Sequence, residues 1–155
     1  MTRKSLLIIV FIFLSICGCK KEDDKNKYSN LSRPDVVLYI YGGRNEEDYL
    51  GKLNAGRYDS ESIWNQYGAY GNKYHSKCIW NVYGTYGSEY SAYSPFNDYA
   101  SNPPVLRDRA GNFYGYFTSN KNKANRADYG IIDAICDNHE KIGDDVGEWY
   151  DIIFR

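Results

Sequence analysis

The chain repeats a 16-residue pattern between residues 58 and 102: YDSESIWNQYGAYG (58–71), YHSKCIWNVYGTYG (74–87) and the shorter YSAYSPFNDYA (90–100). The copies align without gaps, so the same residue types recur at a fixed spacing. The recurring aromatic and asparagine positions are Trp64, Trp80 and Phe96; Asn65, Asn81 and Asn97; and Tyr67, Tyr83 and Tyr99. Such self-similarity is typical of an array in which each copy packs on its neighbours.

Glycines predict sharp turns in the two complete copies, at Gly68 and Gly71 in the first and at Gly84 and Gly87 in the second. Glycine permits positive φ angles or a close approach of the backbone. Only a short extended segment, such as residues 62–65, fits between the turns, and the asparagine that ends it can hydrogen-bond the backbone ahead. Because fewer than three complete copies rarely form a free-standing array, we expect the repeats to pack on the flanking segments.

The flanking segments carry conventional strand signals. Residues 36–41 (VVLYIY) are apolar and are followed by two glycines, which predicts a strand. Residues 105–107 and 113–118 flank the turn-forming segment DRAGN (108–112), which predicts a β-hairpin.

A helix is expected near the C-terminus. Asn125 can cap its start and Gly143 can end it. Its apolar face would carry Ile131, Ile132, Ile135 and Ile142. Residues 149–154 form a further apolar segment that fits a strand or a helix. The sequence thus predicts the α+β class, with mostly short β-strands and turns, Tyr/Gly repeats and one C-terminal helix.

The chain is rich in tyrosine and nearly neutral. It contains 17 Tyr, 14 Gly and one Met, with a net charge of −1. Tyrosine hydroxyls need hydrogen bonds or solvent, which favours a shallow, turn-rich domain over a thick aliphatic core. Because the near-neutral charge offers no broad basic face, we expect no nucleic-acid partner.

The first 18 residues have the pattern of an export signal, with two basic residues before the apolar run 6–16. That run is far shorter than the roughly 20 residues that a membrane-spanning helix requires. It ends in ICGC (16–19), which resembles the lipobox of bacterial lipoproteins. The resemblance implies cleavage before Cys19 and lipid attachment to its thiol. Cys17 is the weaker candidate because a bulky isoleucine precedes it.

A charged stretch, KKEDDKNK (20–27), opens residues 19–33, and its lack of apolar content predicts a flexible tether. A cysteine followed by lysines and acids also resembles the export tag of surface lipoproteins in the Bacteroidota, although a plain solvated spacer accounts for the composition equally well. Membrane lipid, held through Cys19, is the expected partner, at the outer membrane and facing the periplasm or the cell surface. Residues 34–155 are expected to form a single globular domain.

The domain also resembles a family of small bacterial exported proteins with Tyr-Gly-rich 16-residue repeats. The resemblance covers roughly half of the chain and rests on YLGKLN (49–54), the repeats, SPFNDYA (94–100), Pro103-Pro104 and GNFYG (111–115). It implies a relationship in fold and no particular activity, and the same module occurs beside nuclease-like or SH3-like domains. Family members carry two cysteines where this chain has Lys52 and Ala55, so no metal or redox role of that pair is expected here.

The sequence contains no phosphate-binding loop, nucleophile elbow or zinc-protease helix, so we expect no catalytic residue and no cofactor. Beyond the N-terminal segment, the cysteines and histidines form two pairs, His75-x-x-Cys78 and Cys136-x-x-His139. Three interpretations stay open. The residues are unconnected, with Cys78 in place of a repeat serine; or Cys78 and Cys136 form a disulfide in an oxidising exterior; or all four bind zinc.

Two classes of function remain. In the first, which we favour, the chain is a structural or accessory lipoprotein whose aromatic rings pack the repeats. In the second, it is a surface or periplasmic binding domain that uses exposed Tyr and Trp rings on a carbohydrate or protein, because a flat ring with a polar edge suits both. The candidate binding rings are Trp64, Tyr67, Trp80, Tyr83, Phe96 and Tyr99.

Overall fold

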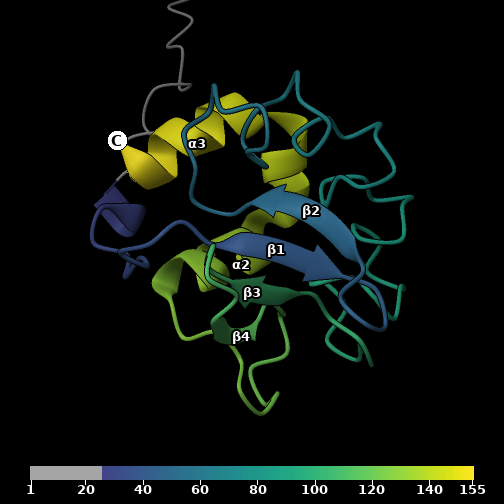
Figure 1. Ribbon diagram of the computed structural model, residues 1–155. Coiled ribbons are helices and arrows are strands. Elements are labelled where there is room, and N and C mark those ends of the chain that lie inside the picture. The colour runs from purple at the N-terminus through teal and green to yellow at the C-terminus, as the bar shows by residue number, and fades with distance from the viewer. Residues whose placement is uncertain (1–25) are drawn as a thin grey trace, which may run out of the picture.

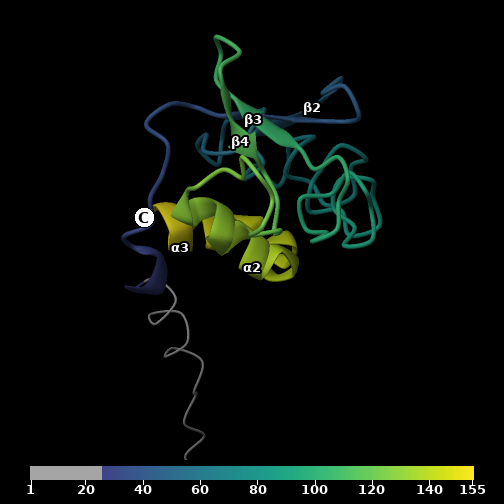
Figure 2. The same cartoon turned by 90° about the horizontal axis from the view of Figure 1, so that it is seen from below.

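The structure is a computed structural model that describes residues 26–155. The predicted signal peptide (1–18), the predicted lipidation site Cys19 and the start of the tether lie outside the described residues. The described part has an antiparallel sheet beside two helices, and the α+β class is confirmed. Figure 2 shows α2 and α3 in a layer against one face of the sheet, with the repeats beside both layers.

Four short strands form the sheet in the order β2-β1-β3-β4, and every neighbouring pair is antiparallel (Figure 1). Their bounds are β1 Tyr39–Gly42, β2 Asp48–Lys52, β3 Val105–Arg107 and β4 Phe113–Tyr116. The predicted hairpin is confirmed as β3 and β4, and the strand expected at 36–41 begins three residues later. Strand β2 was not predicted, because its sequence DYLGK includes a charged residue at each end and a glycine.

Two helices follow, α2 (Gly130–Asp144) and α3 (Val146–Phe154). The segment 149–154, which fitted either a strand or a helix, is therefore helical. The predicted cap at Asn125 is wrong: α2 begins after Tyr129, and Asn125 has a φ of 58° in a left-handed turn. The Asn125 carbonyl accepts a hydrogen bond from the Tyr116 backbone at 2.8 Å instead, which ties this turn to β4.

The domain begins earlier than predicted, because part of the expected tether (19–33) is packed on the helices. Tyr28 is buried, and its hydroxyl accepts a hydrogen bond from the Asn138 side chain at 2.9 Å. Its ring lies 6.0 Å from that of Trp149. Ser32 accepts the first amide of α2 at 2.6 Å. One tyrosine among charged residues carries no sequence period, so only the tertiary contacts reveal this boundary.

The repeats form a continuous chain of hydrogen-bonded turns. The extended segment expected at residues 62–65 is wrong, because the Asn65 amide donates to the Ser62 carbonyl at 3.2 Å and closes a turn there. Turn follows turn, and each residue that closes one also opens the next. In the first copy these residues are Asp59, Ser62, Asn65, Gly68 and Asn72. Four steps of three residues and one of four complete the 16-residue period.

Candidate binding surface on the repeats

Polar side chains at the start of most turns fix the backbone of the repeats. The Asn65 side chain accepts the Tyr67 amide at 3.1 Å, and Asn81 and Asn97 accept the corresponding amides at 3.1 and 2.9 Å. This confirms that the asparagines start turns. Ser62 accepts the Trp64 amide in the same way at 3.1 Å. Such side-chain bonds to the backbone two residues ahead favour a turn over a helix or strand.

Cys78 occupies the turn position that Ser62 and Ser94 hold in the other copies. Burial raises the pKa of its thiol to about 12, and hydrogen bonds from the Trp80 and Asn81 amides act in the opposite direction. The sulfur thus accepts the amide that a serine oxygen accepts elsewhere. Cys78 is therefore a turn residue, as the first of the three interpretations has it.

The other two interpretations of the cysteines are wrong in this structure. Cys78 and Cys136 are both free and buried, so no disulfide joins them. His75 is exposed, and its Nδ1 accepts the Lys77 amide. Among the described residues, the predicted zinc ligands do not gather, and His139 is the one member of that set with metal-ligating neighbours.

One aromatic ring from each copy enters the core. Trp64, Trp80 and Phe96 are at most 6% exposed. The Trp80 indole donates to the Ile63 carbonyl of the preceding copy at 2.6 Å, and Trp64 donates to the Leu53 carbonyl in the same way. Ring centroids are 5.6 Å apart between Trp64 and Trp80 and 6.1 Å between Trp80 and Phe96. These three rings hold the copies together, and the prediction that they are exposed is wrong.

Two tyrosines of each copy are exposed instead, and they form two rows. The first row was predicted as a binding row and consists of Tyr67, Tyr83 and Tyr99. The second row was not singled out and consists of Tyr58, Tyr74 and Tyr90. All six side chains are at least 83% exposed. The signal for the second row was present in the sequence, since its members also recur every 16 residues.

The two rows border a cleft in the second copy and another in the third. Tyr74, Trp80, Asn81 and Tyr83 line a cleft of about 370 Å³, which the C-terminal end of α2 closes on one side. A second cleft, of about 410 Å³, is lined by the equivalent residues one repeat later: Tyr90, Phe96, Asn97 and Tyr99. Both volumes fall in the range of about 300–1,000 Å³ that is usual for small-molecule sites. The repeat therefore builds the same cleft twice.

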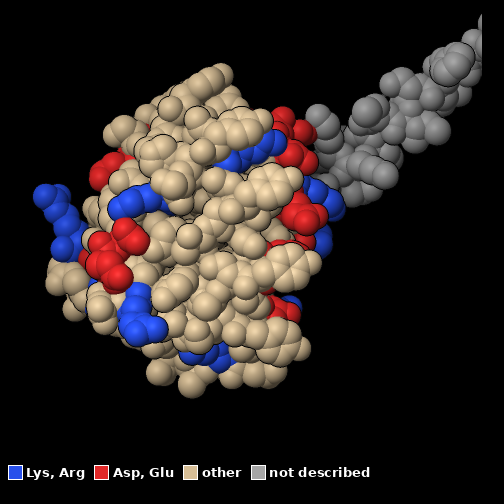
Figure 3. Space-filling model, turned by 90° about the vertical axis from the view of Figure 1, so that its right-hand side faces the viewer, with Lys and Arg blue, Asp and Glu red and all other residues tan. Residues whose placement is uncertain are grey.

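Charged residues line part of each cleft: Lys73, Glu140 and Asp144 in the first, and Glu89 and Asp98 in the second. Figure 3 views the molecule from the side of the repeats, and a broad band of uncharged surface runs down the middle of this face. Exposed aromatic side chains rarely gather on the surface of a soluble domain unless they contact something. The chain matches no protein-family model, no curated protein and no solved structure. Function is therefore inferred from the site itself, and the predicted family resemblance stays a prediction.

Neither helix of the described part, α2 or α3, is both long and apolar enough to cross a bilayer.

Proposed function

We propose that the protein is a non-catalytic binding domain that holds a glycan chain in the tyrosine-bordered clefts of its repeats. One observation carries the proposal: the clefts between Tyr74 and Tyr83 and between Tyr90 and Tyr99 use equivalent residues one repeat apart. The buried Trp/Phe row fits the structural role that we favoured from sequence. The exposed tyrosine rows have no such role, and they support the second class of function.

Tyrosine suits a sugar ligand because its ring offers a flat apolar face and its hydroxyl a hydrogen bond. The apolar face can cover the C–H groups of a sugar ring while the hydroxyl pairs with the sugar hydroxyls. Tyrosine also loses little side-chain entropy on binding, since it has only two rotatable bonds. Here the turn backbone beneath each tyrosine of the first row is fixed by an asparagine, so the rings are presented on a rigid support.

The repetition of the cleft favours a polymeric glycan over a protein. A polysaccharide presents the same unit at regular intervals, and successive clefts can each bind one stretch of it. Weak sites that bind one polymer raise the overall affinity, because the second contact is intramolecular. A protein surface rarely repeats at such a spacing, so a protein ligand would use the two clefts unequally.

The geometry agrees with an anchor at Cys19, which we include in the proposal. At about 3.3–3.6 Å per residue, the nine residues from Cys19 to buried Tyr28 span at most about 30 Å. In Figures 1 and 2 the start of the described chain lies on the opposite side of the domain from the second and third copies. A lipid at Cys19 would leave the clefts of these two copies free to meet a glycan.

Co-sedimentation with insoluble glycans tests the proposal. The full-length chain, purified in mild detergent, is mixed with peptidoglycan sacculi and with a panel of neutral polysaccharides. We expect at least one of them to retain the protein, and Tyr83→Ala combined with Tyr99→Ala to weaken retention more than tenfold. Phe113→Ala is the matched control, because Phe113 is a partly exposed aromatic on β4, outside the clefts. Retention by none of the glycans, or equal retention of the double variant, would refute the proposal.

A further inference from the structure

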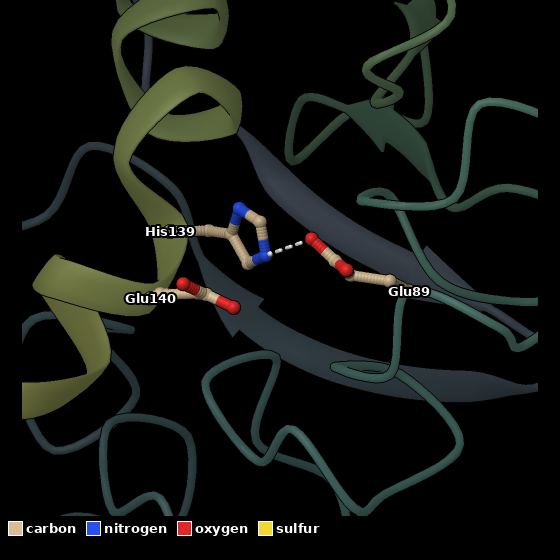
Figure 4. Close-up of side chains that lie close together, drawn as sticks. All are labelled: Glu89, His139 and Glu140. Atoms are coloured by element: carbon tan, nitrogen blue, oxygen red, sulfur yellow. Dashed lines mark ion pairs between the residues drawn. The ribbon is translucent and has the colours of Figure 1, made fainter.

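A histidine and two glutamates from separate parts of the chain meet at the junction of the repeats and α2. His139 and Glu140 belong to α2, and Glu89 directly precedes the third copy (Figure 4). One ligand atom from each of the three lies within 4.8 Å of the other two. None of the three binds an amide within the turns, although Glu140 lines the first cleft and Glu89 the second.

The orientation of the His139 ring is fixed on two sides. Its Nδ1 lies 3.0 Å from the Cys136 carbonyl, which can only accept, so Nδ1 carries the hydrogen. Its ring stacks on Phe96 with centroids 4.2 Å apart and planes 14° apart. Nε2 is therefore the atom that points toward Glu89, as Figure 4 shows.

Nε2 is left without a hydrogen bond. It is buried and has no hydrogen-bond partner among the described residues, although Glu89 Oε1 lies 3.2 Å away. In a neutral imidazole with the hydrogen on Nδ1, Nε2 carries a lone pair. Nε2 and Glu89 Oε1 form an ion pair when the imidazole carries a second proton, and a metal cation between the two atoms would take the place of that proton.

We propose that Glu89, His139 and Glu140 bind one Zn²⁺ ion that joins the repeats to α2. Zinc takes imidazole nitrogen and carboxylate oxygen at about 2.0–2.2 Å, and in a tetrahedron such bonds place neighbouring ligand atoms about 3.4 Å apart. The 3.2 Å between His139 Nε2 and Glu89 Oε1 is close to that spacing. Glu140 supplies the third ligand, and its carboxylate lies within 4.8 Å of the other two ligand atoms.

The surroundings favour a metal of this kind. Metal-binding histidines usually donate their other nitrogen to a backbone carbonyl or a carboxylate, as His139 does to Cys136. Asp98 and Asp137 line a depression together with Glu89 and His139 and add negative charge, which Lys121 offsets in part. Lys141 lines a smaller depression that contains all three ligands, and it offsets part of the charge there. An imidazole ligand favours zinc over Mg²⁺ or Ca²⁺, which prefer oxygen alone.

Cys136 also lines the larger depression but is not part of the ligand set. The group of ligand atoms that lie within 4.8 Å of one another comprises Glu89, His139 and Glu140 and does not include the Cys136 sulfur. Three protein ligands leave a fourth position open to water. Glu89 lines the Tyr90–Tyr99 cleft as well, so the ion would lie at the margin of that cleft.

Zinc titration of the full-length chain in mild detergent, stripped with a chelator and dialysed, tests the site. Calorimetry should give one Zn²⁺ per chain with micromolar affinity that millimolar Mg²⁺ leaves unchanged, and zinc should raise the melting temperature. Glu89→Gln keeps the shape of a half-exposed side chain and should weaken binding at least tenfold. His139→Gln should abolish it. Asp98→Asn is the matched control and should change affinity less than threefold.

A loss of zinc affinity must be distinguished from a loss of structure. Far-ultraviolet circular dichroism establishes that Glu89→Gln is folded, so its weaker binding reports the missing ligand. Co²⁺ in place of zinc should give the visible absorption of a four-coordinate site in the unaltered chain, and Glu89→Gln should lack this absorption. Absence of saturable one-to-one binding below 100 µM zinc would overturn the proposal. Unchanged binding in both Glu89→Gln and His139→Gln would overturn it equally, because the metal would then lie elsewhere.

Discussion

Trp80 is the position at which the packing of the repeats can be measured most directly. Its indole is 2% exposed, lies between the rings of Trp64 and Phe96, and donates to the Ile63 carbonyl at 2.6 Å. Truncation of a buried tryptophan to alanine costs about 3–5 kcal/mol. The Ile63 carbonyl would also lose its partner, at about 1–3 kcal/mol for a buried unpaired group. We therefore expect Trp80→Ala to lower the free energy of unfolding by about 4 kcal/mol or more.

Two companion variants separate the causes. Trp80→Phe reproduces the third copy, where Phe96 fills the same position, and should lose the hydrogen bond, about 1–3 kcal/mol, and a smaller part of the packing than Trp80→Ala. Tyr83→Ala removes a ring that is 97% exposed and should change stability by at most about 0.5 kcal/mol.

Urea unfolding followed by circular dichroism measures all three variants. With a slope of about 2 kcal/mol per molar urea, Trp80→Ala should lower the midpoint by about 2 M or unfold the domain outright. Trp80→Phe should lie between Trp80→Ala and the unaltered chain. An unchanged midpoint for Trp80→Ala, or equal losses for Trp80→Ala and Tyr83→Ala, would refute the assignment of one aromatic row to the core and another to the surface.

Three further predictions concern the turns and their contacts. Burial raises the pKa of Cys78 and of Cys136 to about 12, so a thiol reagent at pH 8 should modify neither residue in the folded chain. After denaturation the reagent should modify both. Fewer than two reactive thiols in the denatured chain would contradict the assignment of both cysteines as free. A hydrogen bond from Lys77 lowers the pKa of Asp48 in the folded chain. The ionised Asp48 therefore stabilises the fold above its unfolded pKa of about 3.9, and this stabilisation is lost as the pH falls through the lower folded pKa. Between pH 5 and 3 the urea midpoint should therefore fall less steeply in Asp48→Asn than in the unaltered chain. A Cβ at Gly87 would overlap carbonyls of the preceding turns, so Gly87→Ala should cost about 1–3 kcal/mol in urea unfolding, and a neutral result would show that the backbone there can move.

The repeat glycines illustrate how one sequence pattern can have two physical causes. Either positive φ angles or close approach of the backbone would account for them from sequence. None of the four is among the described glycines with positive φ, whereas a Cβ at Gly71 would overlap the Asn65 carbonyl and one at Gly87 the Asn81 carbonyl. Close approach is therefore the cause, and only the packing of one turn on another creates it.

Much of the local structure of this protein could be predicted from the sequence alone. The 16-residue period, the turn-starting asparagines, the β3–β4 hairpin and α2 all follow from interactions between residues close together in the chain. Such interactions leave their pattern in the sequence whatever the rest of the chain does.

The direction of each ring and the meeting of distant groups depend instead on long-range packing. Trp80 and Tyr83 each lie two residues beyond the residue that starts a turn, so their local positions are equivalent. Trp80 is nevertheless buried and Tyr83 exposed, because only Trp80 packs into the core. Glu89 and His139 lie 50 residues apart, and no spacing rule connects a turn residue with a helix residue over that distance. Glu89 and His139 come into contact because the Phe96 ring stacks on His139 and thereby packs the third copy on α2.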